Sequence, residues 1–222
     1  MLKIHISRDH LGTTFEGLIA RGAARIDHRS FIRLELLDVA PPPKSDWLFF
    51  LSPSGVRLFA SAYDARGFKI GALWNGTAEA VERYLGTSPE FVGRSEDSEE
   101  ALKEFIAVPG ENETVTVAQS DKGLRRMRGL LEGERLREWT FYSNIPHPPD
   151  EPVDADYILF TSPSNAEAYL SKHALLPNQY ALAIGETTRK SLQRLGYRDV
   201  LTAEEPSEAG MWEAVKRHRG AK

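Results

Sequence analysis

Apolar runs and polar turns alternate along the chain in a pattern that occurs twice. The segments DWLFFLSPS, residues 46–54, and DYILFTSPS, residues 156–164, are identical at five of nine positions. Each is an apolar run that ends in Ser-Pro-Ser, and residues at helical spacing follow it, such as Val56, Phe59 and Tyr63 after the first. Each segment therefore predicts a strand, a turn and a helix.

The two halves of the chain match beyond these segments. The sequence KIGALWNGTAEAVERYLG, residues 69–86, lies opposite YALAIGETTRKSLQRLG, residues 180–196. Each predicts a short strand, a turn, a helix with a threonine at its start (Thr77 or Thr188) and a glycine that ends the helix.

Two further pairs of segments complete the repeat. SEEALKEFI, from Ser98, corresponds to SEAGMWEAV, from Ser207, and both serines are expected to cap a helix. VTVAQSDKGLRRMRGLLEG, from Val115, resembles the N-terminal LKIHISRDHLGTTFEGLIARG. Because strands alternate with helices throughout, the pattern predicts an α/β protein of two similar domains, each a parallel five-stranded sheet flanked by helices.

Two segments rich in β-forming residues are candidates for strands that cross between the domains. They are SFIRLELLD, residues 30–38, and REWTFYSNIP, residues 137–146, and prolines follow each of them. We favour a chain that leaves the first domain and returns to it: residues 1–30 plus 147–222 form that domain, residues 39–138 form an inserted second domain, and residues 31–38 and 139–146 connect them as a two-stranded β-ladder. The alternative is two consecutive domains, residues 1–110 and 111–222.

Composition limits the compartment and the partners. The 222 residues are 41% hydrophobic and 27% charged, as in a globular protein, and the net charge of −4 lacks the overall basic excess of a nucleic-acid binder. With no cysteine, no secretion signal and no run of 18 apolar residues, we expect a cytoplasmic protein without a membrane partner. The basic residues Lys122, Arg125, Arg126 and Arg128 could face a polyanion or form a solvated helix face.

Most motifs of cofactor and metal chemistry are missing from the sequence. It contains no GxGxxG, Walker, HExxH or GxSxG motif, and its six histidines lack ligand spacing. No metal site is therefore expected. The four tryptophans lie in apolar patterns that favour core packing, except that Trp74 occupies a turn and could stack on a ligand.

Hydroxyl-rich loops are the remaining candidates for a site. In an open parallel sheet, ligands bind beyond the carboxyl ends of the strands, and helix N-termini there favour anions. Four such loops open predicted helices: Ser52–Gly55, Asn75–Thr77, Ser162–Asn165 and Gly185–Thr188. The alternative is that these residues only cap their helices.

Together, the doubled strand-SPS-helix pattern, the GTAEA and IGETT turns, the EEPSEAG helix start and the FYSNIP return strand resemble the uroporphyrinogen-III synthase family over nearly the whole chain. The resemblance implies an enzyme that closes linear hydroxymethylbilane into uroporphyrinogen III, with loss of water and inversion of the last pyrrole ring. It also implies that no metal or organic cofactor takes part, and that two α/β domains are joined by a two-stranded ladder.

The resemblance also assigns roles to particular residues. Tyr142, on the return strand, is the candidate that assists departure of the substrate hydroxyl, and its alternative role is packing. The candidates for binding the eight carboxylates of the substrate are Arg8, Ser52, Ser54, Thr77, Ser162, Ser164, Thr187 and Thr188. We expect a monomer that binds this small molecule. The alternative function is a two-lobed small-molecule binding protein or a regulatory protein without catalytic activity.

Overall fold

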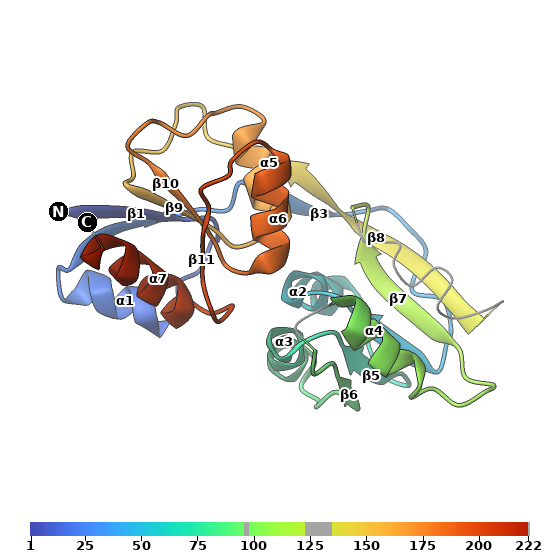
Figure 1. The fold of residues 1–222 in the computed structure, drawn as a ribbon. Coiled ribbons are helices and arrows are strands. Elements are labelled where there is room, and N and C mark those ends of the chain that lie inside the picture. Colours follow the sequence, from blue (N-terminus) through green and yellow to red (C-terminus); the bar gives the residue numbers. More distant parts are fainter. Residues whose placement is uncertain (96–97, 123–134, 222) are drawn as a thin grey trace. The chain divides into compact units, whose positions relative to one another are not determined.

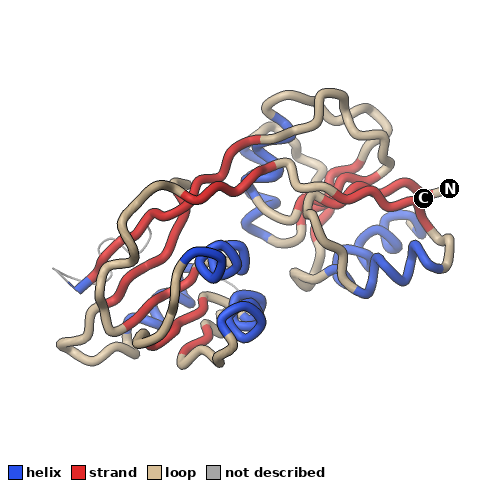
Figure 2. Tube along the Cα trace, turned by 180° about the vertical axis from the view of Figure 1, so that it is seen from behind, coloured by secondary structure: helices blue, strands red, loops and turns tan. Residues whose placement is uncertain are grey.

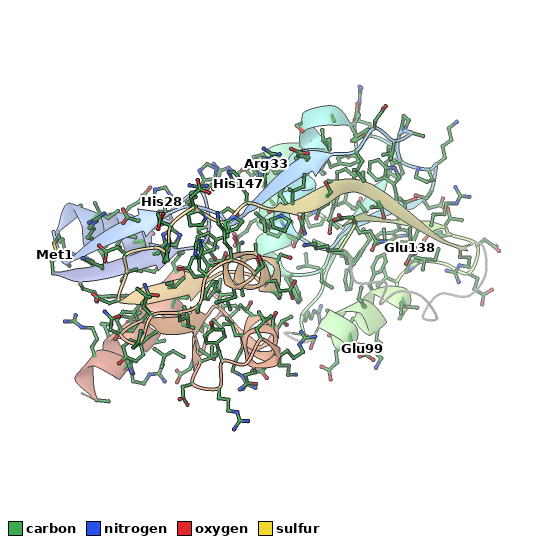
Figure 3. The ribbon with its side chains drawn as sticks, turned by 90° about the horizontal axis from the view of Figure 1, so that it is seen from above. Met1, His28, Arg33, Glu99, Glu138 and His147 are labelled. Carbon is green, nitrogen blue, oxygen red and sulfur yellow. The ribbon has the colours of Figure 1, made fainter. Side chains whose placement is uncertain are left out.

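The computed structural model describes residues 1–95, 98–122 and 135–221, which form two compact units (Figure 1). Unit 1 contains Met1–Arg33 and Ile145–Lys222, and unit 2 contains Leu34–Asn144. Both points of division lie in segments for which connecting strands were predicted. There, β3 (Ile32–Leu36) and β8 (Leu136–Pro146) run side by side (Figure 2). Arg33 lies on β3 and Glu138 on β8 (Figure 3).

Unit 1 is built on a five-stranded parallel sheet in the order β11-β10-β9-β1-β2. Its strands are β1 (Leu2–Ile6), β2 (Ala24–His28), β9 (Tyr157–Phe160), β10 (Tyr180–Ala183) and β11 (Leu201–Thr202). The apolar strand β9 is buried along its whole length because helices cover both of its faces.

Two pairs of helices cover the unit 1 sheet. They are α1 (Thr13–Ala20) with α7 (Glu208–Gly220) and α5 (Pro163–Leu170) with α6 (Glu186–Arg194). Successive residues of β9 point to opposite faces: Leu159 packs in the cluster that includes α1 and α7, and Ile158 packs with α5 and α6. The predicted parallel five-stranded sheet is confirmed for this unit.

Unit 2 contains a six-stranded sheet in the order β3-β8-β7-β4-β5-β6. The further strands are β4 (Trp47–Phe50), β5 (Lys69–Ala72), β6 (Phe91–Val92) and β7 (Val115–Ser120). The helices α2 (Pro53–Ala62) and α3 (Asn75–Leu85) pack on one apolar face, and α4 (Ser98–Ile106) packs on the other.

The prediction of five parallel strands is wrong for the second sheet. The five strands from β8 to β6 are parallel, but β3 adds a sixth at the edge. The amide of Leu37 donates to the carbonyl of Phe141, and the amide of His147 donates to that of Phe31, so these two segments run in opposite directions. The crossing strand satisfies backbone groups of β8 that an open edge would leave unpaired.

The two sheets have the same spatial order, although the chain enters them at different strands. In unit 1 the direction in which strands are added reverses between β1 and β9, and in unit 2 it reverses between β7 and β4. The crevice outside the carboxyl ends of the strands at such a reversal is the usual place for a ligand in open α/β sheets. Each unit therefore has one preferred position for a site.

Serine caps begin several helices as the sequence predicts, but the prediction is wrong for Ser98, which is a helical residue of α4. The hydroxyls of Ser52, Ser162 and Ser207 accept hydrogen bonds from amides three residues further on, and proline occupies the first helical position of α2 and α5. Thr77 and Thr188 do not begin their helices, because Trp74 and Gly185 hold the cap positions in extended conformation. Both threonines lie at the third helical position with buried side chains.

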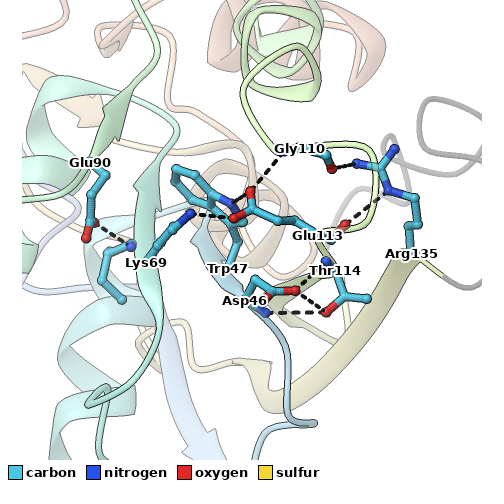
Figure 4. A network of polar contacts seen from close by, with 9 residues as sticks. Asp46, Trp47, Lys69, Glu90, Gly110, Glu113, Thr114 and Arg135 are labelled. Carbon is cyan, nitrogen blue, oxygen red and sulfur yellow. Dashed lines mark hydrogen bonds and ion pairs between the residues drawn. The ribbon is translucent and has the colours of Figure 1, made fainter.

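A polar network joins the amino ends of three strands of unit 2, at the sheet edge opposite the ligand crevice (Figure 4). The Glu113 carboxylate accepts hydrogen bonds from the Trp47 indole at 2.8 Å, the Gly110 amide at 2.9 Å and the Lys69 ammonium group. These donors, with Lys69 the strongest, lower the pKa of Glu113 to about 2. Among the described residues, no helix has both the length and the apolar character needed to cross a membrane.

Candidate functional site

The candidate site in unit 2 lies where strands β4 and β7 end. Ser52 follows β4, and Ser120 is the last residue of β7, so the two hydroxyl side chains come from the two strands at the reversal of strand order. Tyr142 of β8 pairs with Ser120 in the sheet. The tyrosine that the sequence selected is therefore at the carboxyl edge of this sheet.

A β-bulge gives Tyr142 its orientation. In the pairing of β7 with β8, Gln119 lies opposite Thr140, but the next residue, Ser120, lies opposite Tyr142, so Phe141 is an extra residue on β8. Bulges redirect the side chains that follow them. Phe141 stacks on Trp139 with ring centroids 4.4 Å apart in the core.

The Tyr142 hydroxyl belongs to a chain of hydrogen bonds. It lies 3.3 Å from Ser52 Oγ, which also accepts the Gly55 amide at 3.1 Å. The residue is only 6% exposed, and this burial raises the pKa of Tyr142, while its interactions with Ser52 and Ser120 act in the opposite direction. Nearby Asp121 adds to the increase in pKa. Tyr142 is therefore a neutral phenol at physiological pH and can donate a hydrogen bond.

Gly55 makes room for this tyrosine. A Cβ atom at Gly55 would lie 3.3 Å from Ser52 Oγ and 3.4 Å from the Tyr142 hydroxyl oxygen. The matching loop of unit 1 has Asn165 at this position. The two loops, SPSG in unit 2 and SPSN in unit 1, therefore differ only at the residue that lies next to Tyr142 in unit 2.

The other candidates of unit 2 occupy the first turns of α2 and α3. Ser54 is partly exposed at the second helical position of α2. Thr77 is 1% exposed, and within the described part of the chain its hydroxyl has no hydrogen-bond partner. Trp74 donates its indole N–H to the Ser95 carbonyl at 3.2 Å and packs against the core, so in this structure it serves packing.

In unit 1 the loop after β9 holds a second group of candidates. Ser162 caps α5 and also accepts from the Asn165 side-chain amide at 3.1 Å. Asn165 Oδ1 in turn accepts the Phe31 amide at 2.6 Å, which ties this loop to the start of the crossing strand. Ser164 is partly exposed in the first turn of the same helix.

The loop after β10 brings Thr187 and Thr188 to the start of α6. Thr187 is exposed, whereas Thr188 is 3% exposed and faces the protein interior. Because β9 and β10 are paired, this loop and the loop of Ser162 follow adjacent strands of one sheet. The candidates of unit 1 thus share one edge of their sheet.

Arg8 is already paired within unit 1. Its guanidinium lies 3.1 Å from Oε1 of Glu208, and the same oxygen accepts the Gly12 amide at 2.7 Å. The other oxygen, Oε2, is buried without a hydrogen-bond partner among residues 1–95, 98–122 and 135–221. A substrate carboxylate would have to compete with Glu208 for Arg8.

Three residues of these networks, Ser120, Asn165 and Glu208, were not selected from the sequence as site residues. A signal existed for Ser120, because the match of VTVAQS with LKIHIS aligns it with Ser7 at a strand end. Of the basic run, Lys122 is exposed, and Arg125, Arg126 and Arg128 lie outside the described residues. Within the described chain, no group of three or more histidine, aspartate or glutamate residues could hold a metal ion.

Comparison with known proteins identifies the family. The model of the family described as uroporphyrinogen-III synthase HemD matches residues 21–213. Among solved structures, uroporphyrinogen-III synthetase from Helicobacter pylori has a TM-score of 0.66 at 18% identity, covering 99% of this chain and 100% of that one. A mutant uroporphyrinogen III synthase from the extremely thermophilic bacterium Thermus thermophilus has a TM-score of 0.63 at 16% identity, covering 100% of both chains.

At these identities the solved structures establish a shared fold, and no curated protein matches the chain. The family model covers most of the sequence, including every candidate residue except Arg8. This chain therefore belongs to the uroporphyrinogen-III synthase family, the enzymes that cyclise hydroxymethylbilane in tetrapyrrole biosynthesis.

Proposed function

We propose that this chain forms uroporphyrinogen III from hydroxymethylbilane as a hydro-lyase, with loss of water and inversion of the last pyrrole ring, and without a cofactor. The observation that carries this proposal is the neutral Tyr142 phenol held by Ser52 at the reversal point of the unit 2 sheet. Water loss and carbon–carbon bond formation are together redox-neutral, so the chemistry requires no electron acceptor.

The reaction needs a leaving group and a selected conformation. Departure of the substrate hydroxyl as water produces an azafulvene, which the terminal ring attacks at its substituted carbon through a spiro intermediate. Hydroxymethylbilane also closes unaided to the uninverted isomer, so positioning of the substrate decides the product. The protein must hold the chain in a bent conformation before it reacts.

Tyr142 suits the first step as a general acid. A raised pKa keeps the phenol protonated, and its hydrogen bond to the departing oxygen would stabilise the developing negative charge. A positioned acid of this kind contributes roughly 10²- to 10⁴-fold in rate. The remaining acceleration would come from substrate positioning.

The substrate carboxylates would bind at the helix starts of each unit. Unpaired amides at helix N-termini and the helix dipole favour anions. The proposed contacts are Ser52, Ser54 and Thr77 in unit 2, and Arg8, Ser162, Ser164, Thr187 and Thr188 in unit 1. These helix starts follow the carboxyl ends of parallel strands, which supports their role as a binding edge.

We also propose that the inserted segment 39–138 acts as a domain of its own and that the protein works as a cytoplasmic monomer. Its partner would be the polycarboxylate substrate, with no nucleic-acid or membrane partner. The net charge of −4 supports this choice, because attraction to a polyanionic surface needs a basic excess.

Incubation with freshly generated hydroxymethylbilane and chromatographic separation of the isomers tests the proposal. We expect isomer III to form faster than the spontaneous isomer I. Isomer I alone, at the rate without protein, would overturn the proposed activity. Tight substrate binding without closure would instead support the small-molecule binding or regulatory alternative.

A further inference from the structure

Two serines neighbour Tyr142. Ser120, the last residue of β7, pairs with Tyr142 in the sheet, and Ser52 reaches it from the loop after β4. Ser52 Oγ lies 3.3 Å from the Tyr142 hydroxyl, and both serines act against the rise in the pKa of Tyr142 that burial causes. Ser52 is partly buried, and Ser120 is 7% exposed. Tyr142 therefore has one serine neighbour from each of the two strands at the reversal of strand order.

Each serine oxygen accepts a hydrogen bond from an amide, so its own proton can be donated to the tyrosine. Ser52 Oγ already accepts the Gly55 amide at 3.1 Å, and Ser120 Oγ accepts the Asn144 side-chain amide at 3.4 Å. A hydroxyl has one proton to donate and two lone pairs. Each serine can thus donate its own proton to the phenol oxygen while it accepts from a neighbouring amide.

Backbone contacts hold the three residues in this arrangement. The Asp121 amide donates to the Tyr142 carbonyl at 3.0 Å, and the Asp121 side chain accepts the Asn144 amide at 3.0 Å. These bonds lie directly beside the bulge at Phe141 that redirects the tyrosine. These bonds therefore hold the end of β7 against the bulged part of β8.

We propose that Ser52 and Ser120 are positioning residues that both donate hydrogen bonds to the Tyr142 oxygen, so that the phenol proton is directed at the departing hydroxyl of the substrate. The inference rests on the proposed role of Tyr142. If Tyr142 instead donated to either serine, its proton would be unavailable to the substrate. Two accepted hydrogen bonds also polarise the phenol and make it a stronger donor.

Unit 1 provides an internal comparison. Ser7, the counterpart of Ser120, accepts the Thr161 amide at 2.9 Å, and the Thr161 hydroxyl donates to the Ser7 carbonyl at 2.7 Å. The Ser7 and Thr161 hydroxyls lie 3.3 Å from each other. At the end of this strand, unit 1 therefore has a serine that pairs with a threonine of the neighbouring strand. Unit 2 has a serine that lies beside Tyr142.

Titration of the phenol tests the arrangement without substrate. In protein labelled with ¹³Cζ-tyrosine, the Tyr142 resonance is assigned by its loss in Tyr142→Phe. We expect Ser52→Ala and Ser120→Ala each to raise the pKa of Tyr142, because a hydrogen bond donated to the phenolate is removed. Ser207→Ala, which removes an equivalent helix cap from α7, should leave this titration unchanged. An unchanged or lowered pKa in both site variants would overturn the proposal.

Kinetics supply the second readout. Ser120→Ala should lower kcat about 3- to 10-fold, the loss expected for one hydrogen bond, with KM little changed, and Ser120→Thr should restore most of it. In a Tyr142→Phe background, Ser120→Ala should have no further effect, because its role passes through the phenol. If the double variant instead loses kcat by the product of the two single losses, the positioning role of Ser120 would be overturned. Absence of isomer III formation in the wild type would refute the proposed function and leave the titration result standing.

Discussion

Single buried polar groups account for much of the chemistry expected of this protein. Tyr142 keeps its proton because burial disfavours the phenolate, and His5 of β1 is affected by burial in the opposite sense. His5 is 5% exposed, stacks on Phe31 at 4.8 Å and makes a 3.2 Å contact through Nε2 to the Arg29 carbonyl. In each case the environment selects the uncharged form.

Tyr142→Phe should lower kcat by about tenfold or more, as expected when a general acid is lost. The fold should persist, because the ring keeps its packing and loss of the hydroxyl removes hydrogen bonds that contribute about 1 kcal/mol each. Initial rates of isomer III formation, with thermal unfolding as the control, measure both effects. Turnover equal to that of the wild type would reduce Tyr142 to a packing residue.

His5 makes the stability of the protein depend on pH. Burial lowers its pKa below 6.5, and the hydrogen bond with Arg29 only partly offsets this. The unfolded chain therefore binds a proton first, so the free energy of unfolding should fall as the pH drops below about 6.5 towards the lower folded pKa. Above that range the His5 contribution is complete.

Urea unfolding at pH 7.5 and 5.5 measures this dependence. His5→Leu should show a smaller loss of stability between the two pH values than the wild type. His10→Gln, which changes an exposed histidine, should keep the wild-type loss. Equal losses in the wild type and in His5→Leu would assign the pH dependence to other groups.

At the level of elements, a strand end, a bulge and a helix start must fit together around Tyr142. The first turn of α2 approaches the phenol at Gly55, where a Cβ would lie 3.4 Å from the hydroxyl oxygen. The same Cβ would lie 3.3 Å from Ser52 Oγ, which is tighter than most Cβ contacts, so the serine beside the phenol must shift slightly.

Gly55→Ala should therefore lower kcat about 3- to 10-fold, on the scale of one disturbed hydrogen bond, while stability changes little. Gly17→Ala is the matched control, because it lies inside α1 and its Cβ would meet only the side chain of Arg21, at 3.6 Å or beyond. That control should raise stability by about 0.5–1 kcal/mol through helix propensity and leave turnover unchanged. Equal kinetics for both variants would remove the proposed role of Gly55.

The network around Glu113 links elements at the other edge of the unit 2 sheet (Figure 4). Its pKa of about 2 lies below the ordinary value of 4.5, chiefly because Lys69 and Trp47 donate to the carboxylate. The stabilisation is present above about pH 4.5 and is lost as the pH falls towards 2.

Glu113→Gln should flatten the decline of the melting temperature between pH 5 and pH 3 relative to the wild type. Asp150→Asn changes an exposed ion-paired carboxylate outside this network and serves as the comparison. A decline as steep in Glu113→Gln as in the wild type would mean that other carboxylates dominate acid unfolding.

At the scale of the whole molecule, the two units are built alike but differ in the side chains at the carboxyl ends of their strands. Both sheets share one strand order, yet a tyrosine occupies the reversal point of unit 2 and a serine–threonine pair occupies that of unit 1. The duplicated fold therefore has two sets of helix starts, which we propose bind substrate carboxylates, and the proposed acid lies beside one of them.

Removal of metal ions tests the cofactor-independent mechanism at this scale. After dialysis against a chelator, the rate of isomer III formation should equal that of the untreated protein, because the proposed donors are protein groups. Loss of activity that a divalent cation restores would show that the reaction uses a metal.

Local patterns in the sequence were sufficient to predict the strands, the internal repeat, the α/β class and the serine caps at Ser52, Ser162 and Ser207. These features depend on residues a few positions apart, whose spacing sets which side chains are buried and which amides need a cap. Tyr142 and the hydroxyl-rich loops were selected with help from the family resemblance.

The continuation of the predicted ladder into the unit 2 sheet, the bulge at Phe141 and the approach of Ser52 and Ser120 to Tyr142 appear first in the folded chain. So does the pairing of Arg8 with Glu208, while the role of Arg8 in binding a substrate carboxylate stays a prediction. Each depends on register and on partners far apart along the chain, such as Ser52 and Tyr142. Local spacing carries no information about such partners, because their meeting follows from how strands are ordered and aligned in the sheet.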